Sequence, residues 1–121
     1  MLGSTRLVLS MKSVDLFTEL TAIYRKHGWQ LRSVLLRPET RVELQSLLPE
    51  GLLVKEAELD ALWFSRPSHN NREAWELRLL AQTPYALFET FEADETEEER
   101  DDLKLEMEAR LREYLATDKR G

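Results

Sequence analysis

The sequence contains no cysteine, only two histidines, four glycines and four prolines among 121 residues, and no long hydrophobic run. The missing thiols exclude disulfide bonds, thiolate zinc sites and cysteine nucleophiles, and their absence is typical of proteins in a reducing compartment. No apolar stretch approaches the ~20 residues of a membrane-spanning helix, and residues 7–9 are too few for a signal-peptide core. We therefore expect a cytoplasmic protein without a membrane partner.

Groups that carry catalysis are scarce. His27 and His69 are the only histidines, so a catalytic triad or a histidine-based metal site must use one of them. His27 belongs to the last turn of a predicted helix, where the helix dipole favours a cation. The spacing of a calcium loop and that of a phosphate-binding loop are both missing. We expect no metal, no cofactor and no catalytic residue, and this scarcity favours a binding role over an enzyme.

Charge is distributed unevenly along the chain. Residues 1–45 hold seven Lys and Arg against four Asp and Glu, a net charge of +3, whereas residues 46–121 carry −9, giving −6 for the whole chain. An acidic chain without interleaved basic and aromatic residues lacks the electrostatic footprint of nucleic-acid binding. The two parts either attract each other within one monomer or orient a partner or a second copy.

The chain is long enough for one domain with its own core. Hydrophobic periodicity predicts helices over 13–27, 38–48 and 96–116 and strands over 29–36, 59–66, 73–81 and 85–92, whereas 52–58 fits no pattern. The order α-β-α-β-β-β-α predicts an α+β fold, a two-layer sandwich with a mainly antiparallel sheet that ends in a three-stranded meander. We expect residues 1–12 to be a flexible extension or an upstream start before Met11, 13–116 a single domain, and 117–121 a disordered tail.

The predicted meander is the most informative region, because apolar residues fall at both parities of two of its strands. Trp63 and Leu62 point to opposite faces, and so do Leu87 and Phe88. One covering layer would leave one face exposed, so that face needs the short helix, the first ten residues or another molecule. The candidate partner-binding residues are the large apolar side chains in and beside these strands: Leu62, Trp63, Phe64, Trp75, Leu80 and Phe88.

Two polar clusters are further candidate sites. Around the start of the short helix, helix amides and the side chains of Arg32, Arg37 and Arg41 could hold an anion, unless these arginines form a solvated basic face. In the loop 67–72, a small ligand could bind, or a proton transfer be assisted, at the polar residues His69, Asn70 and Asn71. The same residue types are also what a hairpin connection requires.

Together these patterns favour a small acidic protein–protein interaction module, such as an adaptor, a chaperone-like protein or an accessory subunit, that docks through its sheet and aromatic surface. The partner is a second copy, in a homodimer, or another protein. The alternative is a small-ligand-binding domain or small enzyme with a pocket between sheet and helices, using His69 or a carboxylate such as Glu89. A deep pocket with converging polar groups would favour this alternative, and aromatic residues at the surface of a filled core would favour the module.

Overall fold

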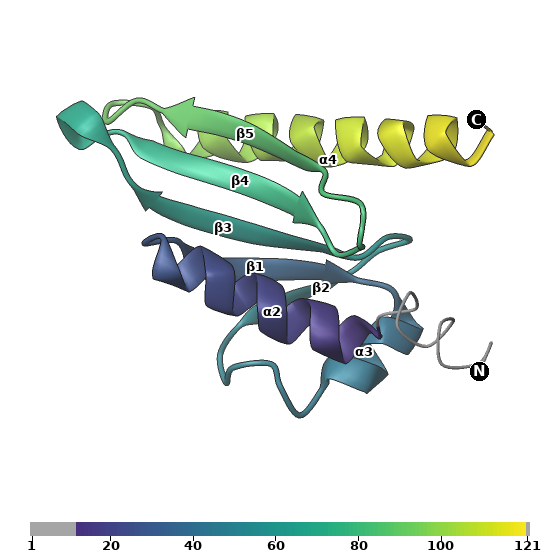
Figure 1. The fold of residues 1–121 in the computed structure, drawn as a ribbon. Helices are drawn as coiled ribbons and strands as arrows, with labels where there is room; N and C mark the ends of the chain where they lie inside the picture. Colours follow the sequence, from purple (N-terminus) through teal and green to yellow (C-terminus); the bar gives the residue numbers. More distant parts are fainter. Residues whose placement is uncertain (1–11, 121) are drawn as a thin grey trace, which may run out of the picture.

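The computed structural model describes residues 12–120, which form a five-stranded mixed sheet with helices on both faces (Figure 1). The elements in chain order are α2 (Ser13–Lys26), β1 (Gln30–Leu36), α3 (Pro38–Leu44), β2 (Leu53–Glu56), β3 (Ala61–Pro67), the short 3₁₀ helix η1 (His69–Asn71), β4 (Glu73–Leu79), β5 (Ala86–Phe91) and α4 (Glu97–Arg120). The expected α+β class is confirmed. Eleven of the twelve residues of the expected N-terminal extension lie outside the described residues.

The sheet has the strand order β2-β1-β3-β4-β5. β3, β4 and β5 are antiparallel neighbours in chain order, as the predicted meander requires. β1 pairs antiparallel with β3 and parallel with β2, so that Val34 lies between Leu62 and Val54. The chain thus passes from β1 through α3 to β2 at the edge, and then returns across the end of β1 to β3.

β2 is the strand that the sequence did not reveal, and it adds one strand to the predicted order. It has only four residues and lies at the sheet edge, where Val54 alone is half-buried. A strand that is buried so little shows no alternation of apolar and polar residues, which explains why residues 52–58 fitted no pattern.

The two-layer expectation needs correction, because helices cover opposite faces of the sheet. In β3, Ala61 and Trp63 face α4, whereas Leu62 and Phe64 face α2 and α3. One cluster contains the buried residues Leu35, Leu59, Ala61, Trp63, Trp75, Leu77, Leu79, Phe91, Met107 and Leu111. The other contains Phe17, Leu20, Tyr24, Val34, Leu36, Leu44, Leu62, Phe64 and Leu80. The arrangement is therefore helix, sheet, helix, and the apolar residues at both parities of β3 lie under the chain's own helices.

The helices lie over opposite ends of the sheet (Figure 1). α2 contacts β1 on one face, and α4 contacts β4 and β5 on the other. Consequently α2 covers β1 and β2, at one edge of the sheet, on one face. On the opposite face, α4 lies toward the other edge, and no helix in the described part of the chain covers β1 and β2.

Local signals set the end of α2 and the start of α4. Gly28, with φ +86°, ends α2, and the N–H of Trp29 donates to the carbonyl of Tyr24 at 2.9 Å. α4 begins with a capping box in which the Glu99 N–H donates to the Thr96 hydroxyl at 3.1 Å and the Thr96 N–H donates to the Glu99 carboxylate at 2.9 Å.

Two helix ends differ from the prediction. α3 ends at Leu44 and not near residue 48, since a turn follows in which the Leu47 N–H donates to the Leu44 carbonyl at 2.8 Å. α4 extends to Arg120, four residues beyond the predicted end and through all but the last residue of the expected tail 117–121. No glycine or proline interrupts residues 97–120, so nothing in the chain stops the helix earlier.

Candidate partner-binding groove

The face of β1 and β2 that α4 leaves uncovered forms the floor of a groove, and one side of α4 forms its wall. Its volume is about 450 Å³. The residues that line it are Arg32, Ser33, Leu35, Leu53, Lys55, Trp63, Trp75, Asp101, Lys104, Leu105 and Glu108. The lining thus combines apolar residues with charges of both signs, and we call it the α4 groove.

Two exposed leucines lie on opposite sides of the α4 groove. Leu53 on β2 is 68% exposed and Leu105 on α4 is 53% exposed. Leu105 lies between Asp101 and Glu108 along one side of the helix, because residues three and four apart share a helix face. Leucine is normally buried when a neighbouring element can cover it, so these two side chains mark surface that is available for burial.

A buried carboxylate ties α4 to the groove floor. Glu108 is only 5% exposed. Its carboxylate accepts a hydrogen bond from the Trp63 indole N–H at 3.0 Å and forms an ion pair with the Lys55 ammonium at 3.4 Å. Because a buried charge is tolerated only when it is paired and hydrogen-bonded, these two contacts tie α4 to Trp63 of β3 and, through the Lys55 side chain, to β2.

Two cations converge on the Trp75 ring at one end of the groove. The Lys104 ammonium lies 3.6 Å from the ring centroid, and the Arg32 guanidinium carbon lies 5.6 Å from it. Partial burial lowers the pKa of Lys104, and the nearby charge of Arg32 lowers it further, while Asp101 opposes the shift. The Trp75 indole N–H donates to the Glu73 carboxylate at 3.2 Å. This end of the groove is partly desolvated and carries charges of both signs, because the adjoining cleft is lined by Arg32, Arg100 and Lys104 and by the carboxylates of Glu73, Glu95, Glu97 and Asp101.

The six candidate partner-binding residues do not gather on one surface. Leu62, Phe64 and Leu80 are 0%, 1% and 7% exposed under α2 and α3, so the monomer offers none of them to a partner. The requirement for a companion over these residues is thereby removed, since the short helix and α2 supply the cover.

The other three lie in two places. Trp63 and Trp75 are buried under α4, at 3% and 7% exposed, but both contribute to the lining of the α4 groove. Phe88 is 58% exposed. It lies on a different face, where its ring meets Trp29 edge-on with centroids 6.4 Å apart.

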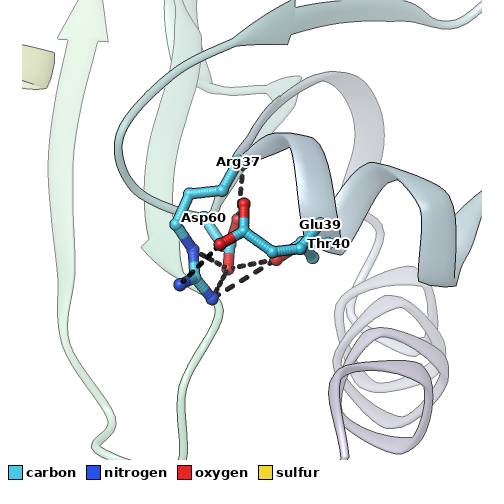
Figure 2. A network of polar contacts seen from close by, with 4 residues as sticks. All are labelled: Arg37, Glu39, Thr40 and Asp60. Carbon is cyan, nitrogen blue, oxygen red and sulfur yellow. Dashed lines mark hydrogen bonds and ion pairs between the residues drawn. The ribbon is translucent and has the colours of Figure 1, made fainter.

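The three arginines of the predicted anion site are also separated. The Arg37 guanidinium binds Asp60, with Nε at 3.1 Å and Nη2 at 2.9 Å from Oδ2 (Figure 2). This contact raises the pKa of Arg37, first through the hydrogen bond and then through the charge of Asp60. Arg32 lies in the α4 groove, and Arg41 is exposed on α3. Arg37 already has a carboxylate partner, and the three side chains do not enclose a common anion site.

Asp60 is the residue of this network that the sequence did not reveal. It is 8% exposed, and its other oxygen, Oδ1, accepts the Arg37 backbone N–H at 2.8 Å. The Thr40 hydroxyl donates to Oδ2 at 2.7 Å, and Glu39 lies at the periphery, 3.9 Å from the Arg37 guanidinium (Figure 2). The network joins the start of α3 to the start of β3.

The polar loop forms a tight turn. His69, Asn70 and Asn71 are exposed in η1, and Asn70 and Asn71 have φ values of 57° and 61°. Asparagine tolerates this left-handed conformation better than most residues. The Ser68 N–H donates to the Arg72 carbonyl at 2.8 Å and the Arg72 N–H donates to the His69 carbonyl at 3.1 Å. The loop has the residues and hydrogen bonds of a hairpin connection.

A second cleft lies between α2 and the segment after α3. Its volume is about 500 Å³. Its lining is mostly apolar and consists of Phe17, Thr18, Thr21, Ala22, Arg25, Trp29, Gln30, Leu31, Leu47, Pro49 and Phe64. A cleft of this size can hold a small molecule. Its described lining contains no carboxylate and no histidine, so it provides no side chain for general acid–base chemistry.

The sequence did not predict the two exposed leucines of the α4 groove, Leu105 on α4 and Leu53 on the edge strand β2. Leu53 belongs to the unassigned segment, and Leu105 lies beside the apolar stripe that contains Leu103 and Met107. The one available signal was Leu105, an apolar residue outside the core-facing stripe of its helix. This signal could not show which surface lies opposite Leu105, because the floor of the groove includes β2, which the sequence did not predict.

Among the side chains that the structure describes, those of residues 12–117, no group of three or more His, Cys, Asp or Glu is placed to hold a metal ion. No helix in this part of the chain is both long and apolar enough to cross a membrane. Comparison of the sequence and structure with models of protein families, with curated proteins and with solved structures gives no significant match.

Proposed function

We propose that this chain is a protein-interaction module that binds an amphipathic helix of a partner in the α4 groove. The observation that carries the proposal is the pair of exposed leucines, Leu53 and Leu105, on the two sides of a sheet face that no described helix covers. The module proposed from the sequence is thus retained, with its docking surface on the β1 and β2 end of the sheet.

The dimensions of the groove suit one helix. Strands lie about 4.8 Å apart, so the uncovered β1 and β2 give a floor roughly 10 Å wide. Packed helices lie about 8–10 Å apart, so a helix beside α4 would rest on this floor. Such a helix would extend the layer that α4 begins and would bury Leu53 and Leu105.

The expected affinity gain can be worked from the two leucines. Burying a fully exposed leucine contributes about 1.5–3 kcal/mol. With 68% and 53% of their surface exposed, Leu53 and Leu105 would contribute about 1–2 kcal/mol each and about 2–4 kcal/mol together. A charged residue at either position loses this burial and also places a charge against the apolar face of the partner. Binding should therefore weaken at least tenfold, since about 1.4 kcal/mol corresponds to a factor of ten.

A peptide-display selection tests the proposal. Helix-forming peptides of about 20 residues are selected on the wild-type protein and their Kd values measured on Leu105→Glu and Val42→Glu. Val42 is a matched control, because it is an apolar helix residue, 72% exposed, on α3. We expect most selected peptides to lose at least tenfold in affinity on Leu105→Glu and to keep it on Val42→Glu.

Selected peptides that bind both variants equally would contradict the proposal. Analytical ultracentrifugation of the same variants distinguishes the two kinds of partner. A wild-type dimer that becomes monomeric on Leu105→Glu but not on Val42→Glu would identify the second copy as the occupant of the groove. A monomeric wild-type protein that binds selected peptides would identify another protein.

A further inference from the structure

We infer that β5 pairs antiparallel with β5 of a second copy of this chain, so that two five-stranded sheets join into one continuous sheet. The inference goes beyond the proposed function, because β5 and the floor of the α4 groove lie at opposite edges of the sheet. A dimer that forms through β5 would leave both α4 grooves open to partners.

β5 is an edge strand without the features that usually prevent edge pairing. It pairs with β4 on one side, and no described strand lies on its other side (Figure 1). Its 6 residues, Ala86–Phe91, contain no lysine and no proline, and its register with β4 has no bulge. The other edge strand, β2, has only 4 residues and carries Lys55. Natural sheets protect their edges by short strands, lysine, proline and bulges, so β5 is the edge that remains open to pairing.

Backbone hydrogen bonds show which residues of β5 face the open edge. The Leu79 N–H donates to the Tyr85 carbonyl at 3.0 Å, whereas the Leu80 N–H donates to the Asp60 carbonyl at 2.9 Å, on the β3 side. Odd-numbered residues of β4 and β5 therefore bond to each other, because bonded and non-bonded pairs alternate in an antiparallel ladder. The outward-facing N–H and C=O groups are those of Ala86, Phe88 and Thr90.

These outward-facing residues define one register for a pair of β5 strands. Phe88 lies opposite Phe88 of the second copy, Ala86 lies opposite Thr90, and each such pair exchanges two hydrogen bonds. The Thr90 N–H, whose contact is a 3.3 Å bond to the neighbouring Glu89 carboxylate, gains a backbone acceptor. A shift by two residues in one direction would oppose two Glu89 side chains. A shift in the other direction would bring Pro84, which has no N–H, into the ladder.

The side chains of β5 suit this register on both faces of the sheet. Phe88 is 58% exposed and meets the Trp29 ring edge-on, so a second Phe88 would extend an aromatic cluster that already exists. Aromatic pairs across neighbouring strands stabilise a sheet. On the other face, Leu87 would lie opposite Glu89 of the second copy, so like charges do not meet within the ladder.

The position of α4 permits this pairing. α4 contacts both β4 and β5 and runs antiparallel to β5. Arg100 near its start lies 5.6 Å from the Phe91 ring centroid, and Tyr114 near its end stacks on Tyr85 with centroids 3.6 Å apart. Because strands lie about 4.8 Å apart, pairing of β5 would set the two α4 helices roughly 10 Å apart, a normal packing distance for helices.

The flank of α4 that the second copy would meet is the side opposite the α4 groove. Its exposed charged residues are Asp102, Glu106, Arg110 and Glu113. Arg110 of each copy would lie among the acids of the other, and the excess of acids would oppose association. Salt screens such exposed charges, so we expect the dimer to strengthen as salt concentration rises.

Analytical ultracentrifugation of the full-length protein tests the inference with Phe88→Glu and Phe88→Lys. Each variant places like charges opposite each other at the two-fold axis, so each should weaken the dimer by at least about tenfold. An equal mixture places Glu opposite Lys and should restore a dimer with one copy of each. Leu105→Glu is the control, because Leu105 is an exposed apolar residue of the α4 groove. Circular dichroism shows whether each variant is folded.

A single cysteine gives a second measurement, because the chain contains none. In a hydrogen-bonded antiparallel pair, opposite Cα atoms lie about 5.5 Å apart, a distance that a disulfide spans. Phe88→Cys should therefore form a disulfide-linked dimer on oxidation. Val42→Cys, at an exposed position on α3, should stay monomeric in the same gel.

The outcomes separate the inference from the proposed function. A dimer that is kept on Leu105→Glu and lost on both Phe88 variants supports the inference. A wild-type protein that stays monomeric up to about 1 mM overturns it and leaves β5 to a strand of another protein. A dimer that persists in both Phe88 variants, or a mixture of them that stays monomeric, also overturns it. Peptide binding in the α4 groove is measured separately and can succeed or fail in each case.

Discussion

The Asp60 network gives the sharpest test of the fold. Asp60→Ala removes a carboxylate that accepts four hydrogen bonds, three from Arg37 and one from Thr40. The Arg37 side chain is 46% exposed, so water can replace part of what its guanidinium loses. Thr40 is only 1% exposed, and its hydroxyl and the Arg37 backbone N–H would lose their acceptor. At about 1–3 kcal/mol for each orphaned group, the free energy of unfolding should fall by about 3 kcal/mol.

Urea denaturation, followed by tryptophan fluorescence and circular dichroism, measures this loss. Thr40→Val is the matched control, because it keeps the volume of the side chain and removes one short hydrogen bond to Asp60 and one long hydrogen bond, 3.4 Å, from Arg37. We expect it to cost about 1 kcal/mol. A loss below about 1 kcal/mol for Asp60→Ala, or equal losses for both variants, would refute the reasoning that the carboxylate organises this junction.

Two further predictions concern buried polar contacts. Burial, and then the hydrogen bond that Tyr24 donates to Glu76, raise the pKa of Tyr24, so above pH ~10 the unfolded chain loses this proton first and stability falls. The advantage of wild type over Tyr24→Phe in denaturation experiments should therefore shrink between about pH 10 and 11.5; a constant difference would contradict the assignment. Glu108→Ala leaves the Trp63 indole N–H unpaired and should cost about 1–3 kcal/mol, whereas Glu108→Gln keeps an acceptor and should cost about 1 kcal/mol or less. Equal losses in urea denaturation would show that the hydrogen bond is not what matters.

The elements with strong local signals could be predicted from the sequence. α2 has apolar residues at helical spacing and Gly28 after it, and β4 alternates through Trp75, Leu77 and Leu79, so period and punctuation suffice. The excess of apolar residues in β3 correctly indicated cover on both faces. The sequence could not show whether a second molecule or the chain's own helices cover β3, because both arrangements produce the same pattern.

The α4 groove could not be predicted, since it depends on contacts between residues far apart in the chain. β2 carries little burial signal, and its parallel pairing with β1 places Leu53 on the groove floor. The contact of Trp63 with Glu108 spans 45 positions. Nothing in the sequence indicates that Trp63 and Glu108 are in contact, because a glutamate on a helix is normally solvated.

The position of β3 has a consequence for how the protein opens. Five successive β3 residues, Ala61–Ser65, are buried, and the strand pairs with β1 on one side and β4 on the other. Each hydrophobic cluster uses one face of this strand, so α4 can detach from its side while the α2 side stays closed, and the reverse also holds. Partial opening of the protein would then occur in two independent ways, one on each face of the sheet. The backbone of β3 stays protected in both, because only global unfolding exposes it to water.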